Sequence, residues 1–475
     1  MQTESKLWQE QYDEVRVRSY LTSLMLILLA TSLATADQQR PNIVFLLTDD
    51  QRADLLGVAG NKYAKTPNLD ELAGQGTLFE NAFVTTSICM TSRASIMLGQ
   101  HALRHGINAF NVSLTQDQLQ ASYFGQLKSA GYQLGFIGKW GVGSPPEDFF
   151  DFNRGFPGQG KYYSDEEGQA EHLTARMGNE ALEFLNQVET DRNFCLSISF
   201  KAPHVEEGHP ENVFNYDRNL KELYSDVTIP RVPLTEPKYY DQLPDFLKSS
   251  ENRKRWTSRF ATKHLAQASL KGYYRLVAGV DLVVGQIRAA LEERGLADNT
   301  VIIFSSDNGF YLGERGLAGK WYAHEESIRV PLIVYDPRIP ESQAGQRRAE
   351  MALNIDLPST ILDYANLTSP PSMQGRSLKP LVDGNSFDGT DGGPGWPSNF
   401  FYGHYLDWNG IPKSEAVRTH QWKYITYLDV TPPYEELYDL TKDPLEATNL
   451  ADQPESASTL QDFRRLHKVM RLTVQ

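Results

Sequence analysis

The sequence predicts an α/β fold: a large domain with a central, mostly parallel sheet flanked by helices, plus a smaller C-terminal α+β subdomain with an antiparallel sheet. Three observations predict this fold class. Short apolar runs typical of buried strands recur between helical segments, and 475 residues exceed what one compact core usually holds. A run rich in Gly, Pro and Asp then separates the last fifth of the chain from the rest.

Five buried strands are predicted, because each apolar run is too short for a helix. They are Asn42–Leu47, Gln133–Ile137, Phe194–Phe200, Thr300–Phe304 and Pro331–Tyr335. Between the third and fourth, residues 270–294 carry apolar side chains at helical spacing and end at Gly295, which predicts a helix covering the sheet. The polar, Pro-punctuated stretch 205–262 is interpreted as an excursion at the rim of a site.

The glycine-rich run DGNSFDGTDGGPGWPS, residues 383–398, predicts a flexible loop near a domain boundary. We therefore place a catalytic domain at 37–382 and a C-terminal subdomain at 383–475. The subdomain is expected to contain antiparallel strands over 399–405, 415–419 and 422–427 and a helix in the tail from Gln453.

The N-terminal region predicts export. An apolar stretch, residues 21–33, follows Arg16 and Arg18 and ends at small residues, which predicts a signal peptide over residues 1–36. The stretch is shorter than the roughly 20 residues of a membrane-spanning helix. We expect a secreted or periplasmic protein with no membrane association after cleavage.

Composition excludes some function classes. Lys and Arg total 46 against 60 Asp and Glu, a net charge of −14, which argues against a nucleic-acid-binding protein. The two cysteines, Cys89 and Cys195, cannot form a disulfide framework, and neither has the spacing of a zinc ligand. Cys195, inside an apolar strand, is interpreted as a buried core residue.

Polar residues follow four of the predicted strands, where open α/β sheets bind ligands. In strand order they are Asp49 and Asp50, Lys139, His204, and Asp307 and Asn308. One such acidic pair is usually a turn or a helix cap, a lone lysine is usually solvated, and a lone histidine is often a satisfied loop residue. Three carboxylates and one amide oxygen that converge from two strand ends, however, favour a Ca²⁺ or Mg²⁺ site.

Cys89 precedes a helix-like run in SICMTSRASIMLG, residues 87–99. From the residues alone it is either a small buried side chain or a thiolate nucleophile activated by the helix N-terminus and Arg93. A third interpretation is that Cys-x-x-Ser-Arg resembles the signature of type I sulfatases. In that family the cysteine is oxidised to formylglycine, whose hydrated aldehyde is the nucleophile.

Five further segments are similar to sulfatase segments in the order of the family. They are PNIVFLLTDDQR (41–52), TPNLDELAGQGTLFENAF (66–83), SSDNG (305–309), GKWYAHEESIRVPLIVYDP (319–337) and ELYDLTKDPLEATNLA (436–451). The resemblance covers nearly the whole mature chain. It implies the alkaline-phosphatase-like fold and a sulfuric ester hydrolase, and the exported context suggests sulfated carbohydrates as substrates.

The resemblance also implies a role for each matched residue. Asp49, Asp50, Asp307, Asn308 and the modified Cys89 would bind Ca²⁺, Arg93 would steady the formylglycine hydroxyls, Lys139 and Lys320 would contact the sulfate, and His204 would protonate the leaving alcohol. Loss of a proton from the second formylglycine hydroxyl would then expel sulfate and regenerate the aldehyde. A formylglycine-generating or anaerobic maturation enzyme is an implied partner.

Two positions depart from the family pattern. Thr91 replaces the usual Pro or Ala within the cysteine signature, which bears on conversion of Cys89. Gly141 stands where the family usually has a histidine that assists release of sulfate, so either another base, such as His324, His101 or His105, substitutes, or the pocket serves another substrate or none.

Two residues keep open alternatives. His324 either contacts substrate or, with Glu325, fixes its loop to the sheet. Arg52 either reaches a substrate carboxylate or pairs with a neighbouring Asp. For the whole protein, the alternatives are a phosphodiesterase or phosphonate monoester hydrolase of the same superfamily and a catalytically silent, carbohydrate-binding homologue.

Overall fold

The structure, a computed structural model, describes residues 40–475 except 165–169, 190, 207–212, 388–394 and 409. Residues 41–475 form one compact unit. The predicted signal peptide, residues 1–36, and the middle of the predicted glycine-rich loop lie outside the described residues. None of the helices in the described ranges combines the length and apolar character needed to cross a bilayer.

The central sheet has eight strands in the order β10-β2-β9-β6-β1-β5-β3-β4. Their bounds are β1 Asn42–Thr48, β2 Thr77–Phe83, β3 Gln133–Lys139, β4 Phe152–Phe156, β5 Phe194–Ser199, β6 Thr300–Ser306, β9 Leu332–Tyr335 and β10 Gln346–Leu353. All pairings are parallel except those of β9, which runs antiparallel to β6 and β2. All five predicted strands are present, whereas β2, β4 and β10 were not predicted.

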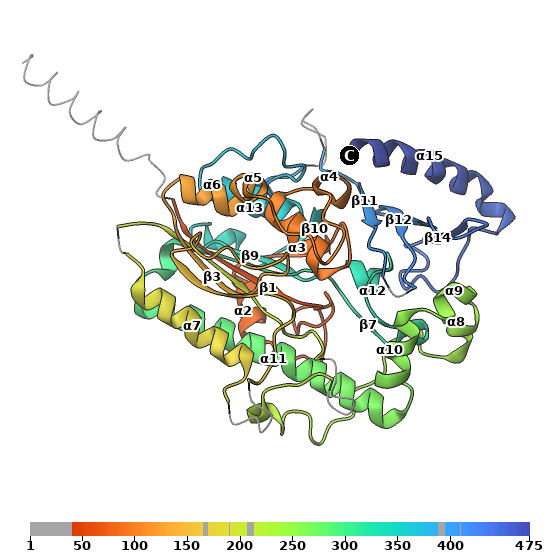
Figure 1. Cartoon of the computed structure of the whole chain (residues 1–475), viewed down its shortest axis with the longest axis horizontal. Helices are drawn as coiled ribbons and strands as arrows, with labels where there is room; N and C mark the ends of the chain where they lie inside the picture. Colours follow the sequence, from red (N-terminus) through yellow and green to blue (C-terminus); the bar gives the residue numbers. More distant parts are fainter. Residues whose placement is uncertain (1–39, 165–169, 190, 207–212, 388–394, 409) are drawn as a thin grey trace, which may run out of the picture. The chain divides into compact units, whose positions relative to one another are not determined.

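Both faces of the sheet are buried because successive side chains of a strand point to opposite faces. In β1, Val44 and Leu46 join the core beneath one helical layer, and Ile43 and Phe45 join the core beneath the other. The first layer comprises α2 Pro67–Gln75, α7 Leu173–Gln187 and α11 Lys263–Glu293; the second comprises α3 Cys89–Leu98, α5 Gln116–Ala121, α6 Tyr123–Ser129 and α13 Asp356–Tyr364 (Figure 1). The predicted helix over 270–294 is therefore the larger part of α11.

The stretch 205–262 contains more regular structure than the sequence predicted. Its described part includes α8 Pro237–Asp241, α9 Asp245–Lys248 and α10 Glu251–Arg259. Helix α10 packs against the short hairpin of β7 Tyr311–Leu312 and β8 Ala318–Gly319, which leads into Lys320. The remaining short helices are α4 Ala102–His105, α12 Glu325–Ile328 and α14 Lys379–Val382.

The C-terminal part forms an antiparallel sheet, which confirms the predicted fold class. Its strands are β11 Asn399–His404, β12 Ser414–Thr419, β13 Trp422–Tyr427 and β14 Tyr434–Asp439, in sequence order, followed by α15 Ala457–Thr473. In β11, Phe401 packs under α15 while Phe400 and Tyr402 join the core of the large sheet. The two sheets thus share a core, and the domain boundary at 383 stays a prediction.

Candidate active site

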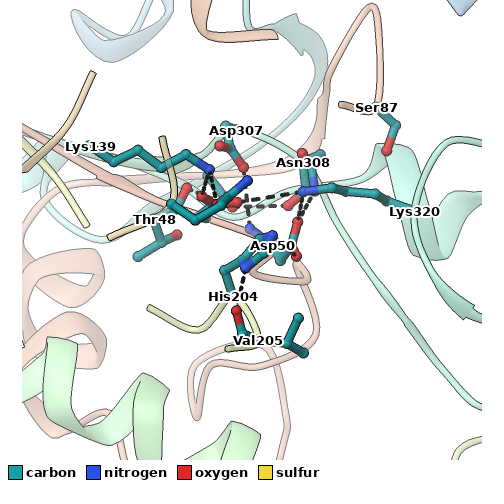
Figure 2. A network of polar contacts seen from close by, with 12 residues as sticks. Thr48, Asp50, Ser87, Lys139, His204, Val205, Asp307, Asn308 and Lys320 are labelled. Carbon is teal, nitrogen blue, oxygen red and sulfur yellow. Dashed lines mark hydrogen bonds and ion pairs between the residues drawn. The ribbon is translucent and has the colours of Figure 1, made fainter. Parts of the chain in front are cut away.

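The ends of β1 and β6 bring four predicted metal ligands together (Figure 2). Asp49 and Asp50 follow β1, and Asp307 and Asn308 follow its parallel neighbour β6. The Asn308 amide Nδ2 donates to Asp50 Oδ1 at 2.6 Å, and the Asp50 backbone N–H donates to Asp307 Oδ1 at 3.2 Å. All four side chains are buried, so this edge of the sheet forms an enclosed cluster of oxygen atoms.

The turn that carries Asp50 is held from two other elements. Asp50 has a φ of 73°, a left-handed conformation that is uncommon for a residue with a side chain. Tyr273 of α11 donates its hydroxyl to the Asp50 carbonyl and accepts the Arg52 N–H at 3.2 Å. Ser306 Oγ accepts the Gln51 N–H at 2.9 Å. These contacts fix the direction in which the Asp50 carboxylate points.

Three cations face these carboxylates. Lys139, the last residue of β3, lies 2.5 Å from Asp49 Oδ2. Lys320 contacts Asp50 Oδ1, and its Nζ lies 3.6 Å from Asp49 Oδ1. Arg93 Nε lies 2.8 Å from Asp307 Oδ2, and Nη2 lies 3.4 Å from Asp49 Oδ2. Three carboxylates therefore meet three cationic side chains in this buried site.

Helix α3 links Cys89 to the cluster. Cys89 is its first residue and Arg93 follows four residues later, so both lie on one face of the helix. Burial lowers the pKa of Lys320, but Asp50, Cys89 and the other nearby acids raise it above its ordinary value. Burial lowers the pKa of Arg93, whereas Asp307, Asp49 and, to a smaller extent, Cys89 raise it above its ordinary value. The buried Cys89 side chain thus lies within electrostatic reach of both cations.

His204 follows β5 and completes the cluster. Its Nδ1 lies 2.6 Å from the Val205 carbonyl oxygen, which only accepts, so Nδ1 carries a proton. Its Nε2 lies 3.7 Å from Asp50 Oδ2 and faces the site (Figure 2). Burial lowers the pKa of His204 well below its usual range. The ring is therefore neutral at rest, and Nε2 is the atom positioned for proton transfer.

Burial raises the pKa of the acids in the cluster, and the neighbouring charges then decide the direction of each net shift. Burial raises the pKa of Asp49, but Lys139, His204, Lys320 and Arg93 together hold that pKa well below its usual value. Burial and the charge of Asp49 raise the pKa of Asp307 to about 6. A further positive charge at this site would stabilise the ionised form of Asp307.

The donor set fits a divalent cation. Asp49 Oδ1 and Asn308 Oδ1 are buried and have no hydrogen-bond partner among the described residues. Buried oxygen atoms are rarely left unpaired, because desolvation then goes uncompensated. Asp49, Asp50 and His204 also place ligand atoms within 4.8 Å of one another. A hard cation such as Ca²⁺, which prefers carboxylate and amide oxygens, would satisfy these atoms.

The absence of a side chain at Gly141 has a steric reason. Gly141 has a φ of +84°, and a Cβ placed on it would lie 2.4 Å from Arg93 Cδ. A larger residue would be strained and would displace the Arg93 side chain from Asp307 and Asp49. The observed position of the Arg93 side chain therefore requires a glycine at residue 141.

The structure does not bring every predicted site residue into the cluster. His324 Nδ1 bonds to the Tyr311 hydroxyl at 2.6 Å and Nε2 to Glu436 Oε2 at 2.9 Å. Glu325 pairs with Lys423 at 2.7 Å. These contacts match the alternative in which His324 and Glu325 fix their loop, here to the C-terminal sheet.

Arg52 matches its structural alternative as well. It lies 2.7 Å from Asp54 and contacts Glu314. Both ring nitrogens of His105 are in hydrogen bonds, one of them with Ser95 Oγ. Ser95 is six residues along α3 from Cys89, about 9 Å at the helical rise. Burial lowers the pKa of His101, at the start of α4, to about 4.

Several contacting residues were not predicted. Arg93 donates to Ser199 Oγ, Lys139 donates to Gln159 Oε1 at 2.7 Å, and Tyr162 donates to the His204 carbonyl at 2.7 Å. Ser199 ends β5, so its position at a strand end was a usable signal. Nothing in the sequence indicates Gln159 or Tyr162, which lie on loops.

Comparison with known proteins decides the family. The family model "Sulfatase" matches residues 41–367, more than half of the chain. The chain belongs to the sulfatase family. A second family model, for the C-terminal part of N-sulphoglucosamine sulphohydrolase, matches residues 313–473 of this sulfatase. The family resemblance seen in the sequence is thereby confirmed.

Individual sulfatases align with almost the whole chain. The sulfatase is 27% identical to an N-acetylglucosamine-6-O-sulfatase of Bacteroides thetaiotaomicron, over 95% of this chain and 90% of the relative. It is 27% identical to an ulvan-active sulfatase of Formosa agariphila, over 93% and 84%. A solved structure in complex with its substrate D-glucosamine-2-N,6-O-disulfate superposes with a TM-score of 0.74 at 24% identity, covering 92% of this chain and 98% of that one.

Proposed function

We propose that this sulfatase is a calcium-dependent sulfuric ester hydrolase that removes sulfate from carbohydrates, with a formylglycine made from Cys89 as its nucleophile. One observation carries the proposal. The buried cluster at the strand ends, which Arg93 of α3 joins, combines three carboxylates with three cations and leaves Asp49 Oδ1 and Asn308 Oδ1 without hydrogen-bond partners among the described residues. Such a site suits one metal ion and one tetrahedral anion.

Each residue has a task in ester hydrolysis. Asp49, Asp50, Asp307 and Asn308 would hold Ca²⁺, which supplies positive charge toward the sulfuryl oxygens and the nucleophile. Lys139 and Lys320 orient the sulfate and stabilise the charge that grows on it, because their ammonium groups are already fixed by Asp49 and Asp50. Arg93 holds the side chain of residue 89 in line with the ester.

The leaving alcohol needs a proton. His204 Nε2 faces the site while Nδ1 is anchored to the Val205 carbonyl, so the ring moves a proton at Nε2 only. We assign His204 as the group that protonates the leaving oxygen. Because Nε2 of the neutral ring carries no proton, the ring first takes up a proton from solvent, which the negative charge of a bound sulfate ester favours, and then gives it to the leaving oxygen. Tyr162, which bonds to the His204 carbonyl, holds this residue in position.

The carbohydrate substrate class is supported by the relatives. Two sulfatases aligned over most of this chain are named for N-acetylglucosamine 6-sulfate and for ulvan. The predicted signal peptide supports a secreted or periplasmic enzyme, which would meet sulfated polysaccharides outside the cytoplasm. We further propose a catalytic domain over 37–382, a C-terminal subdomain over 383–475, and a maturation enzyme as the partner that modifies Cys89.

The test combines assays of ester hydrolysis with mass spectrometry of residue 89. The full chain is co-expressed with a formylglycine-generating enzyme, residue 89 is identified by mass spectrometry, and the protein is assayed on sulfated mono- and oligosaccharides and on phosphate and phosphonate esters. We expect an aldehyde at position 89 and sulfate release, both lost in Cys89→Ala. Faster phosphonate turnover would favour a phosphonate hydrolase, and an intact thiol without turnover would favour a silent, carbohydrate-binding homologue.

A further inference from the structure

Three aromatic rings and one arginine form a continuous group beside the site, here named the aromatic array: Phe110, Trp321, Trp408 and Arg255. The indoles of Trp321 and Trp408 have centroids 5.7 Å apart, and Phe110 meets Trp408 edge to face at 5.9 Å. The Arg255 guanidinium lies 4.8 Å from the Trp321 ring and 5.6 Å from the Trp408 ring. Four separate segments of the chain thus supply one array.

The array begins next to a residue of the sulfate site. Trp321 follows Lys320 directly, and it has a φ of 89°, which is costly for a bulky side chain. The Tyr402 hydroxyl bonds to the Trp321 carbonyl at 2.5 Å, and Asn252 of α10 donates to the Lys320 carbonyl at 3.0 Å. The same backbone contacts therefore fix the ammonium that faces Asp50 and the first ring of the array.

The outer end of the array is exposed. Phe110 is 51% exposed, whereas Trp321 is 2% exposed and Trp408 lies between them. Phe110 follows α4, which packs beside β11, and Trp408 follows β11 (Figure 1). The array thus presents one exposed ring to solvent, with a partly buried ring and a buried ring packed behind it.

One atom of the array lacks a partner. Trp321 Nε1, a hydrogen-bond donor, is buried and bonds to none of the described residues. Indole N–H groups usually find an acceptor when they are buried. A hydroxyl or anionic oxygen of a bound ligand would supply that acceptor. This observation points to a ligand independently of the exposure of Phe110.

We propose that the aromatic array is a subsite that binds the sugar unit next to the sulfated unit of an oligosaccharide. The inference rests on the proposed function and names the form of its substrate. The apolar C–H face of a pyranose packs against aromatic rings, and its hydroxyls suit the Trp321 Nε1 donor. Arg255 is paired with Glu251 at 3.0 Å, so its guanidinium braces the rings and adds little net charge to the array.

The test compares chain lengths of the substrate. Sulfated mono- and tetrasaccharides prepared from heparin are titrated calorimetrically into protein with the Cys89→Ala change, which prevents turnover. We expect the tetrasaccharide to bind at least tenfold more tightly than the monosaccharide, and Phe110→Ala to lower that ratio about five- to tenfold. Trp408→Ala is the second variant, and Phe110→Tyr should restore most of the ratio. Leu282→Ala, 53% exposed on α11, is the matched control and should leave both affinities unchanged.

The outcomes separate the two proposals. An unchanged ratio in both Phe110→Ala and Trp408→Ala, with folded protein confirmed by circular dichroism, would overturn the subsite. A tetrasaccharide that binds no more tightly than the monosaccharide would also overturn it. Absence of sulfate release in the turnover assay of the unaltered chain would instead count against the proposed function, since the binding ratio is measured without turnover.

Discussion

The segment from Glu314 to Glu326 contributes to two buried clusters of charge that differ in one respect. In the catalytic cluster, Asn308 Oδ1 has no hydrogen-bond partner among the described residues, and the ion pair of Asp49 Oδ1 with Lys320 Nζ is long, at 3.6 Å. In the second, here named the junction cluster, Arg315, His324 and Glu325 pair with residues of the C-terminal part. Those pairs are Arg315 with the Leu445 and Glu446 carbonyls, His324 with Glu436 at 2.9 Å, and Glu325 with Lys423 at 2.7 Å. Lys423 Nζ also lies 2.6 Å from Glu446 Oε1, so the ion pairs of this cluster are shorter than the one at Asp49 Oδ1, although neither of these two atoms has a hydrogen bond of regular geometry.

This difference separates binding from stability. A cluster whose charges are paired closely within the protein stabilises the fold only when it is complete, because removing one member leaves another charge buried and unpaired. In a cluster whose oxygen atoms lack close partners, the free energy lost by desolvation is not compensated within the protein, and a bound ligand can compensate it. We therefore expect changes in the catalytic cluster to affect metal binding and turnover, and changes in the junction cluster to affect the free energy of unfolding.

The largest effect is expected from Asp307→Ala. This change removes a carboxylate from the site and the partner of Arg93, and we expect kcat/KM for sulfate esters to fall about 10³-fold or more. Calcium should no longer raise the melting temperature. Glu183→Gln, at a half-exposed position on α7, serves as the control and should retain both properties. Normal turnover in Asp307→Ala, with calcium-dependent stabilisation kept, would refute the metal assignment.

A second prediction concerns the junction cluster. Lys423→Met leaves Glu325 and Glu446 buried without their shared cation, and we expect a loss of about 3–5 kcal/mol in the free energy of unfolding measured with urea. Arg154→Met breaks a half-exposed pair with Glu183 and should cost less than about 1 kcal/mol. Equal effects in the two variants would show that the junction cluster contributes no more than a surface pair.

A smaller effect is expected from Tyr273→Phe. The change removes one hydroxyl that bonds to the Asp50 carbonyl and the Arg52 N–H, so the left-handed turn loses support without loss of packing. Calcium affinity, measured calorimetrically, should fall about tenfold, as is typical for residues that orient metal ligands. Tyr274→Phe removes a neighbouring hydroxyl that bonds to Asn61, and it should leave calcium affinity unchanged. Identical affinities in both variants would exclude a positioning role for Tyr273.

The same comparison explains what the sequence predicted. The acidic part of the catalytic cluster was predictable because the carboxyl ends of the strands in an open α/β sheet converge on a ligand site. Cys89, Arg93 and Lys320 were predicted from the resemblance of their segments to sulfatase segments. The contact of Tyr273 with Asp50 was not, because it joins residues 223 positions apart on elements whose packing no local pattern specifies.

The junction cluster could not be predicted from local sequence patterns for a further reason. Glu436 is 2% exposed and lies in β14, which was not predicted, because a strand reading YEELYD places acids where burial rules expect apolar residues. Its burial depends on His324, 112 positions away. The sequence left the role of His324 open for that reason, whereas the five apolar strands were predicted with nearly correct bounds.

A last prediction is a pH dependence of stability that arises outside both clusters. Burial lowers the pKa of His404, in β11, to about 4, and its ring nitrogens have no partners among the described residues. The unfolded chain, with a histidine pKa near 6.5, binds a proton between pH 6.5 and 4 that the folded protein does not. Stability from this group is therefore present above pH 6.5 and falls as the pH decreases toward 4, by at most about 1.4 kcal/mol per pH unit. His404→Phe should reduce the slope of unfolding free energy against pH in that range, while His420→Phe, at a less buried histidine, should change it less; equal slopes in His404→Phe and the unaltered chain would contradict the assignment.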